Sequence, residues 1–121
     1  MELIAWVGFG LAVILCGLFL LTCWGGARST PTRNAWAGIR IPSTMVSDEA
    51  WTAAHAAALP HANICAIAVV PVVVVMLFFI GTIPLVAAVM EWALATVALA
   101  WMLVATAVAS RAAKAVTNAD H

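Results

Sequence analysis

The chain has 121 residues, of which 66% are hydrophobic and only 8% are charged, and its formal net charge is zero. About a quarter of the residues in a typical soluble domain are charged, so this composition excludes an ordinary soluble globule. The neutral balance also gives no basic field that would attract nucleic acid. The sequence therefore predicts an integral membrane protein whose few charges lie in its loops.

The first predicted element is an uncharged apolar run over residues 3–24. A helix needs about 20 apolar residues to cross a bilayer, and this run exceeds the roughly 7–15 residues of a signal-peptide core. We therefore predict a retained transmembrane helix, ended by the glycine pair at 25–26. Gly8, Ala12 and Cys16 recur every four residues. This stripe either allows another helix to approach closely or is a chance feature of an Ala/Gly-rich chain.

A polar segment over residues 25–60 follows, and we predict a cytoplasmic loop that leads into a short interfacial helix. Pro31 and Pro42 disfavour a continuous helix in the loop. Ser47 is a suitable N-cap for the short helix, and two acidic residues follow it in the first turn. We expect this helix to lie on the membrane surface or to lead obliquely into the second span, with Pro60 at the bend.

Residues 62–80 carry no charge and predict the second span. The valine run in this segment would favour a strand in water, but an isolated strand cannot satisfy its backbone in lipid. Residues 81–84 predict a tight turn, residues 85–109 the third span, and residues 110–121 a C-terminal tail whose last residues fray. The fold class is thus an all-α membrane protein: one domain over residues 1–121, with three transmembrane helices and a short interfacial helix before the second.

The basic residues predict the orientation. Three spans place residues 25–60 and the C-terminus on one side of the membrane, and all five basic residues lie on that side: Arg28, Arg33, Arg40, Arg111 and Lys114. Because positive charge collects on the cytoplasmic side, we predict that this side is cytoplasmic and that the N-terminus is outside.

The polar segment also carries a set of residues at defined spacing. They are Arg33, Asn34, Gly38, Ile39, Arg40, Pro42, Thr44, Trp51 and His55. This set resembles the signature of the SdpI family, R-N-x-x-x-G-I/V-R-x-P-x-T followed by W-x-x-x-H. That family comprises small bacterial membrane proteins named after an immunity protein against a secreted killing peptide. Residues 56–61 depart from the family pattern, and three spans are fewer than the immunity protein has, so the resemblance implies membership rather than a shared toxin.

Within this set, Arg33 and Arg40 can each bind a lipid phosphate or a partner's carboxylate through planar, bidentate donors. Asn34 and Thr44 can tie the loop together by bonding to nearby backbone. Gly38 can supply a backbone angle or a close approach that other residues resist.

Pro42 is expected to stiffen the turn that follows it. Trp51 is expected to anchor the interfacial helix at the membrane surface. His55, one turn later, is expected to donate a hydrogen bond to a loop carbonyl or to sense pH. Two interpretations of the whole set stay open: it only folds the loop, or it also forms a binding surface.

Glu91 is the one charged residue inside a predicted span. A carboxylate within the membrane is costly and is a functional candidate by default. The neighbouring Trp92 instead favours a position at the outer interface, where Glu91 would reach headgroup water. We favour this membrane-interface position.

No metal, cofactor or catalytic site is predicted. His55 and His61 are six residues apart rather than four, so with Glu49 they do not match a helical metal site. No nucleophile–base pair, paired carboxylates or phosphate-binding glycine loop indicates catalysis. The cysteines lie inside apolar runs and are predicted to be structural thiols: Cys16, Cys23 and Cys65.

These observations predict a non-enzymatic protein of the bacterial plasma membrane. Besides the bilayer, its expected partner is another membrane protein or a membrane-active peptide, or else a lipid, and nucleic acid is excluded. It would be either immunity-like or an accessory subunit of a larger membrane complex. The alternative is a homo-oligomeric channel or small transporter.

Overall fold

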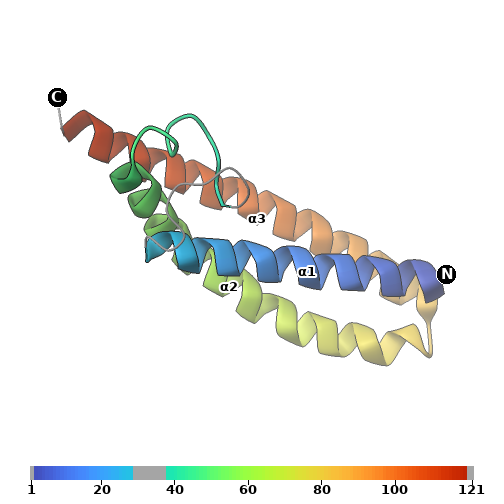
Figure 1. The fold of residues 1–121 in the computed structure, drawn as a ribbon. Coiled ribbons are helices and arrows are strands. Elements are labelled where there is room, and N and C mark those ends of the chain that lie inside the picture. The colour runs from blue at the N-terminus through green and yellow to red at the C-terminus, as the bar shows by residue number, and fades with distance from the viewer. Residues whose placement is uncertain (1, 29–37, 120–121) are drawn as a thin grey trace.

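The computed structural model describes residues 2–28 and 38–119, and within these parts it contains three α-helices and no strand (Figure 1). The helices are α1 (Glu2–Ala27), α2 (Asp48–Ile80) and α3 (Pro84–Ala119). Each is long and apolar enough to cross a membrane. The predicted fold class, an all-α protein with three membrane-spanning helices, is confirmed.

Two of the helices are longer than a bilayer requires. α2 has 33 residues and α3 has 36, which at about 1.5 Å per residue gives roughly 50 Å each. The hydrocarbon core of a bilayer is only about 30 Å thick. Unless they tilt strongly, both helices therefore extend beyond that core.

A separate interfacial helix is not seen in the described residues. α2 begins at Asp48, where the Ser47 side chain accepts a hydrogen bond from the backbone N–H of Ala50 at 3.0 Å, as the predicted N-cap requires. The helix then continues through Pro60 and Pro71 to its end. In Figure 1 its first turns lie at an angle to the remainder. The predicted segment is thus the beginning of α2 rather than an element of its own.

Two predicted helix ends are also too early. α1 includes the glycine pair and ends at Ala27, and α3 continues beyond residue 109, the predicted end of the third span, to Ala119. Packing holds α3 beyond the predicted end of the span as far as residue 113, because Ala109 and Ala113 are fully buried in the main core.

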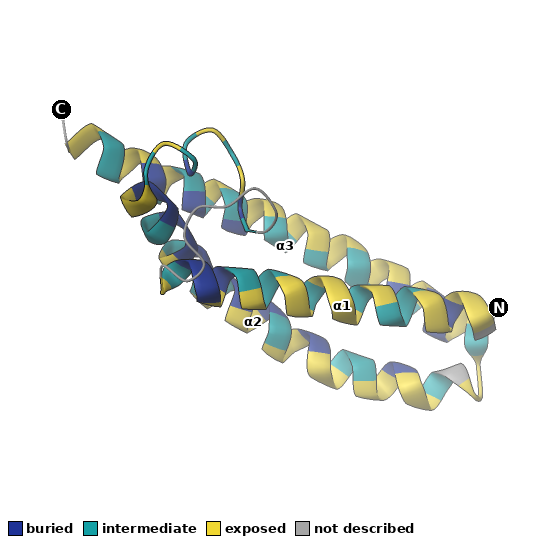
Figure 2. Cartoon of the chain, in the orientation of Figure 1, coloured by how far each residue is buried: buried dark blue, intermediate teal, exposed yellow. Residues whose placement is uncertain are grey.

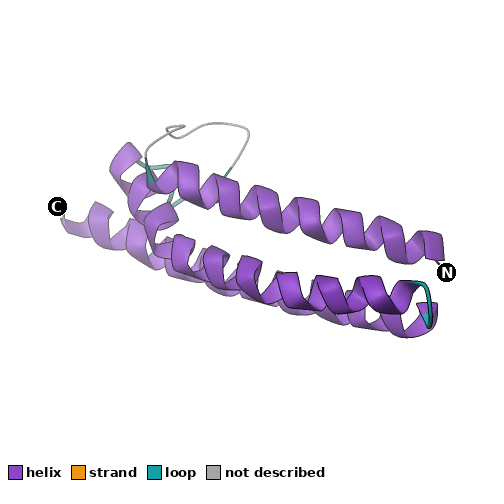
Figure 3. Cartoon of the chain, turned by 90° about the horizontal axis from the view of Figure 1, so that it is seen from below, coloured by secondary structure: helices purple, strands orange, loops and turns teal. Residues whose placement is uncertain are grey.

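The main core is built from alanines. One face of α2 and one face of α3 supply its fully or almost fully buried alanines, namely Ala50, Ala54, Ala58, Ala62, Ala105, Ala109 and Ala113. Such small side chains let two helix backbones approach closely. α2 and α3 thereby form a closely packed antiparallel pair (Figure 3).

The connections place the chain ends at opposite ends of the bundle. α2 and α3 are joined by a tight turn, in which the N–H groups of Thr82 and Ile83 donate to the carbonyl of Phe79 at 3.1 and 2.8 Å. This turn lies beside the N-terminus, whereas the C-terminus lies at the end that carries the α1–α2 loop (Figure 1). We call these the turn end and the loop end.

Burial is concentrated at the loop end (Figure 2). Along the rest of the bundle large apolar side chains face outward; Leu3, Ile67 and Phe78 are each more than 70% exposed. Contiguous apolar surface of this kind is not tolerated in water. It fits a lipid environment.

Candidate functional site

His55 is the centre of the loop end. Its side chain is fully buried, and its Nε2 accepts a hydrogen bond from the backbone N–H of Ile39 at 3.0 Å. Since an N–H group can only donate, Nε2 carries no proton, and a neutral ring then carries its proton on Nδ1. Nδ1 lies 2.8 Å from the carbonyl of Trp51 and donates to it. Both ring nitrogens are thus occupied, and the bond to the loop is accepted rather than donated as predicted.

Thr44 fixes the same part of the loop from the other side. It is fully buried, and its Oγ1 lies 2.6 Å from the carbonyl oxygen of Ile39, to which it donates. The same Oγ1 accepts a hydrogen bond from the N–H of Ile41 at 3.2 Å. The predicted role of Thr44 in tying the loop to itself is confirmed.

Gly38 lies where no other residue fits. Its φ of 105° is a conformation that side chains with a Cβ rarely adopt. A Cβ on Gly38 would also lie 2.6 Å from Cη2 of Trp51 and 2.7 Å from Nε2 of His55. Both predicted reasons for a glycine, the backbone angle and the close approach, therefore apply.

Trp51 is part of the buried site and does not anchor the helix at the membrane surface. Only 1% of its surface is exposed, and its ring centroid is 4.1 Å from that of His55. Its Nε1 has no hydrogen-bond partner within the described residues. The predicted surface role is wrong because the first turns of α2 pack inside the bundle.

Sequence reasoning missed two contributors to the site. A Cβ on Gly26 of α1 would overlap the ring of His55, so the helix can pass this close only with glycine there. The hydroxyl of Ser43 lies 3.2 Å from that of Ser110, which links the loop to α3. A glycine pair before a polar loop was the available signal for the first contact.

Two further residues of the motif, Arg40 and Pro42, are not part of this buried cluster. Arg40 and Pro42 are exposed, so the guanidinium of Arg40 lies on the surface between two residues whose backbones are held by buried side chains. Arg33 and Asn34 lie outside the described residues. Among the described residues of the motif, Thr44, Trp51 and His55 thus form a buried frame, and Arg40 is the arginine that this frame displays on the surface.

Glu91 occupies a separate position near the turn end. Its side chain is only 5% exposed and turns toward α1, where a Cβ on Gly8 would overlap its carboxylate. Oε2 has no hydrogen-bond partner in the described parts of the chain. Glu91 is thus enclosed by the bundle, not directed outward to headgroup water as we favoured, whereas the neighbouring Trp92 is 67% exposed.

The titratable and sulfur-bearing residues do not gather into a metal site. Within residues 2–28 and 38–119, no group of three or more His, Cys, Asp or Glu side chains is arranged to hold a metal ion. All three cysteines are free thiols.

The comparisons with known proteins agree with the motif. Residues 31–110, more than half of the chain, match the SdpI/YfhL protein family. No curated protein and no solved structure matches the chain. The matched region contains the loop, α2 and most of α3, including the frame built on His55 and Thr44. The chain belongs to the SdpI/YfhL protein family.

Proposed function

We propose that this membrane protein is non-enzymatic and uses Arg40 to bind an anionic group of a membrane partner. The observation that carries the proposal is that the residues on either side of Arg40 are held by hydrogen bonds to buried side chains. Ile39 is bonded to His55 and Thr44, and Ile41 to Thr44, while Arg40 itself is exposed. A frame that fixes both neighbours also fixes the direction in which the arginine leaves the surface.

Fixing this arginine favours binding. A guanidinium offers a planar fork of donors that matches a carboxylate or a phosphate bidentately. Holding the backbone beforehand reduces the conformational entropy that is lost when the partner binds. The frame therefore supports a recognition role beyond simple folding.

The buried residues of the frame support a role other than catalysis. A general base needs a free lone pair within reach of a substrate proton. In His55 both nitrogens are already bonded, and the Thr44 hydroxyl is engaged with the loop backbone. Using either group for chemistry would dismantle the loop.

The partner's anionic group is either a carboxylate of a membrane protein or peptide, or a lipid phosphate. A membrane-active peptide corresponds to an immunity-like role, and a larger membrane protein corresponds to an accessory subunit. We place the loop end on the cytoplasmic side of a bacterial plasma membrane, because the described basic residues are at this end: Arg28, Arg40, Arg111 and Lys114.

A photo-crosslinking experiment tests this proposal. A photoreactive amino acid replaces Val46, which is exposed on the same loop, and the full chain is irradiated in its native membrane. We expect a discrete adduct whose yield falls about tenfold or more in R40A, recovers partly in R40K, and is unchanged in R111A, which removes another exposed arginine at the same end.

The lipid alternative has its own measurement. The purified chain is titrated with vesicles of neutral lipid and with vesicles containing anionic lipid. Stronger binding of anionic vesicles that depends on Arg40, without a protein adduct, would identify the phosphate. If R40A changes neither the adduct nor vesicle binding, the proposed role of Arg40 is wrong.

One observation favours a second candidate function, ion movement through a homo-oligomer or small transporter. The Glu91 carboxylate is buried in the bundle and has an unpartnered oxygen among the described residues. Such groups line ion or proton pathways in membranes. Ion flux into liposomes that contain the wild-type chain, and its loss in E91Q, would support this candidate; equal flux for both would exclude it.

A further inference from the structure

Two of the three cysteines lie together between helices. The thiols of Cys16 on α1 and Cys65 on α2 lie close enough to interact with each other. Cys65 is 8% exposed and Cys16 is half-buried. The third thiol, that of Cys23, is fully buried in the alanine core and has no such partner among the described residues.

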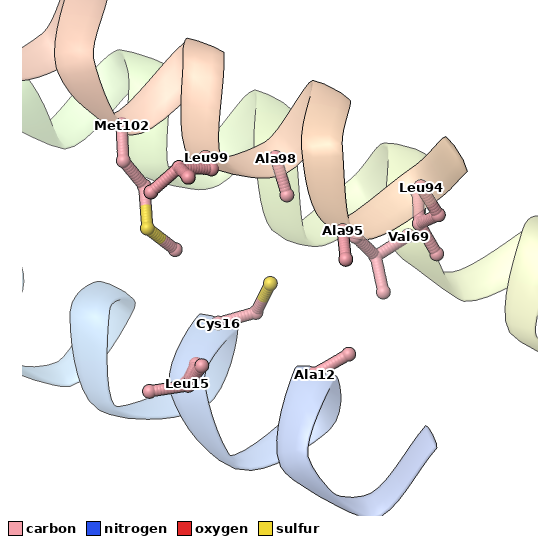
Figure 4. Close-up of a pocket in the computed structure, with 9 residues that line it drawn as sticks. All are labelled: Ala12, Leu15, Cys16, Val69, Leu94, Ala95, Ala98, Leu99 and Met102. Atoms are coloured by element: carbon pink, nitrogen blue, oxygen red, sulfur yellow. The ribbon is translucent and has the colours of Figure 1, made fainter. Parts of the chain in front are cut away.

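The two thiols line spaces that adjoin each other between the helices. Cys16 lines a cavity of about 80 Å³ between the three helices, and Figure 4 shows its sulfur pointing from α1 toward α3. Cys65 lines an adjoining groove of about 240 Å³ between α2 and α3. Val69, Leu94 and Ala98 line both spaces. The cavity leaves room for a sulfur to change its rotamer.

The apolar surroundings accommodate an uncharged disulfide better than a charged form of sulfur. A thiolate is costly in an apolar interior, because an isolated charge loses its hydration there. A disulfide carries no charge, and it replaces two weakly polar S–H groups. The groove beside Cys65 is lined by apolar side chains, including Ile64 and Val97, which are exposed to the lipid side. An oxidant that reaches the pair must therefore be soluble in lipid.

We propose that Cys16 and Cys65 are an oxidisable dithiol that a lipid-soluble quinone converts into a disulfide between α1 and α2. Two S–H bonds break and one S–S bond forms. The two electrons and two protons that are released reduce the quinone to its hydroquinone. The product ties the middle of α1 to the middle of α2, and a dithiol reductant reverses the reaction.

The test uses the full chain in nanodiscs and a fully substituted benzoquinone, which oxidises thiols without alkylating them readily. After exposure, the protein is denatured and its free thiols are counted by maleimide labelling. We expect the wild type to change from three labelled thiols to one, and C23S from two to none. C16S and C65S should keep both of their remaining thiols.

Peptide mapping provides a second readout that does not depend on the variants. Proteolysis of the oxidised wild type should yield a reductant-sensitive fragment that joins α1 to α2. The proposal is overturned if the wild type keeps three thiols while a dithiol peptide in the same nanodiscs is oxidised. It is also overturned if C16S or C65S loses thiols as the wild type does, since Cys23 would then be a partner.

Discussion

The loop end and the turn end each bury a polar side chain, but the two side chains differ in their hydrogen bonding. At the loop end both nitrogens of His55 are hydrogen-bonded to backbone groups. At the turn end Glu91 is almost as well buried, yet its Oε2 lacks a partner within the described residues. A buried polar group costs free energy unless it is bonded. Hydrogen bonds within the fold therefore offset the cost of burying His55. In the described part of the chain they do not offset the cost of burying Glu91, and a costly buried carboxylate in a membrane protein usually has a functional role.

The packing around His55 is also more extensive than the packing around Glu91. The loop end contains the large alanine core and most of the fully buried side chains (Figure 2). At the turn end the buried cluster consists of Ala5 and Ala87, with Phe79 packed against them. Most of the free energy of unfolding should thus come from the loop end. The turn end can accommodate the carboxylate of Glu91 because it contributes less to the stability of the fold.

The largest effect is expected from H55A. This change removes a fully buried ring and leaves the N–H of Ile39 without an acceptor, so the free energy of unfolding should fall by about 4 kcal/mol. H55Q, whose amide oxygen can accept that N–H bond, should recover part of the loss. SDS-induced unfolding followed by circular dichroism measures both values. Equal losses in the two variants would show that a hydrogen-bond acceptor at this position is not sufficient to hold the loop.

The next effect concerns the glycine of the motif. G38A places a Cβ against the rings of Trp51 and His55 and forces an unfavourable φ, so we expect a loss of about 3 kcal/mol. G10A is the matched control, because a Cβ on Gly10 meets nothing within 4 Å. In the same unfolding assay G10A should lie within about 0.5 kcal/mol of the wild type. A small effect of G38A would mean that the frame is looser than the contacts indicate.

The spans were predictable from sequence because length and apolar composition alone decide which segments can cross a bilayer. The positions of individual residues at the two ends depend on contacts between distant parts of the chain, and these contacts cannot be read from the sequence of a single segment. Pro60 suggested a boundary, but the packing of α2 carries the helix through it. Trp51 suggested a membrane surface, but it is enclosed by the loop. The burial of Glu91 depends on Gly8, which is distant in the sequence.

A double-mutant cycle tests the contact at the turn end. A Cβ on Gly8 would overlap the carboxylate of Glu91, so G8A should lower the free energy of unfolding by about 2 kcal/mol. In an E91A background the same change should cost little, because the clashing group is absent. The coupling between the two sites should therefore exceed about 1 kcal/mol. Additive effects would place the carboxylate elsewhere.

The smallest effect, and the one with the opposite sign, is expected from E91M. Methionine keeps a similar length and flexibility but has no oxygen that requires a partner. If Oε2 is unbonded in the folded protein, the substitution should raise the free energy of unfolding by about 1 kcal/mol. The same exchange at the loop end, H55M, should lower it, because the bonds to Ile39 and Trp51 are lost. A loss of stability in E91M would show that the carboxylate is bonded after all, and the two ends would then follow the same rule. A gain in stability together with a loss of ion flux would mark Glu91 as a residue retained for its function at a cost to the fold.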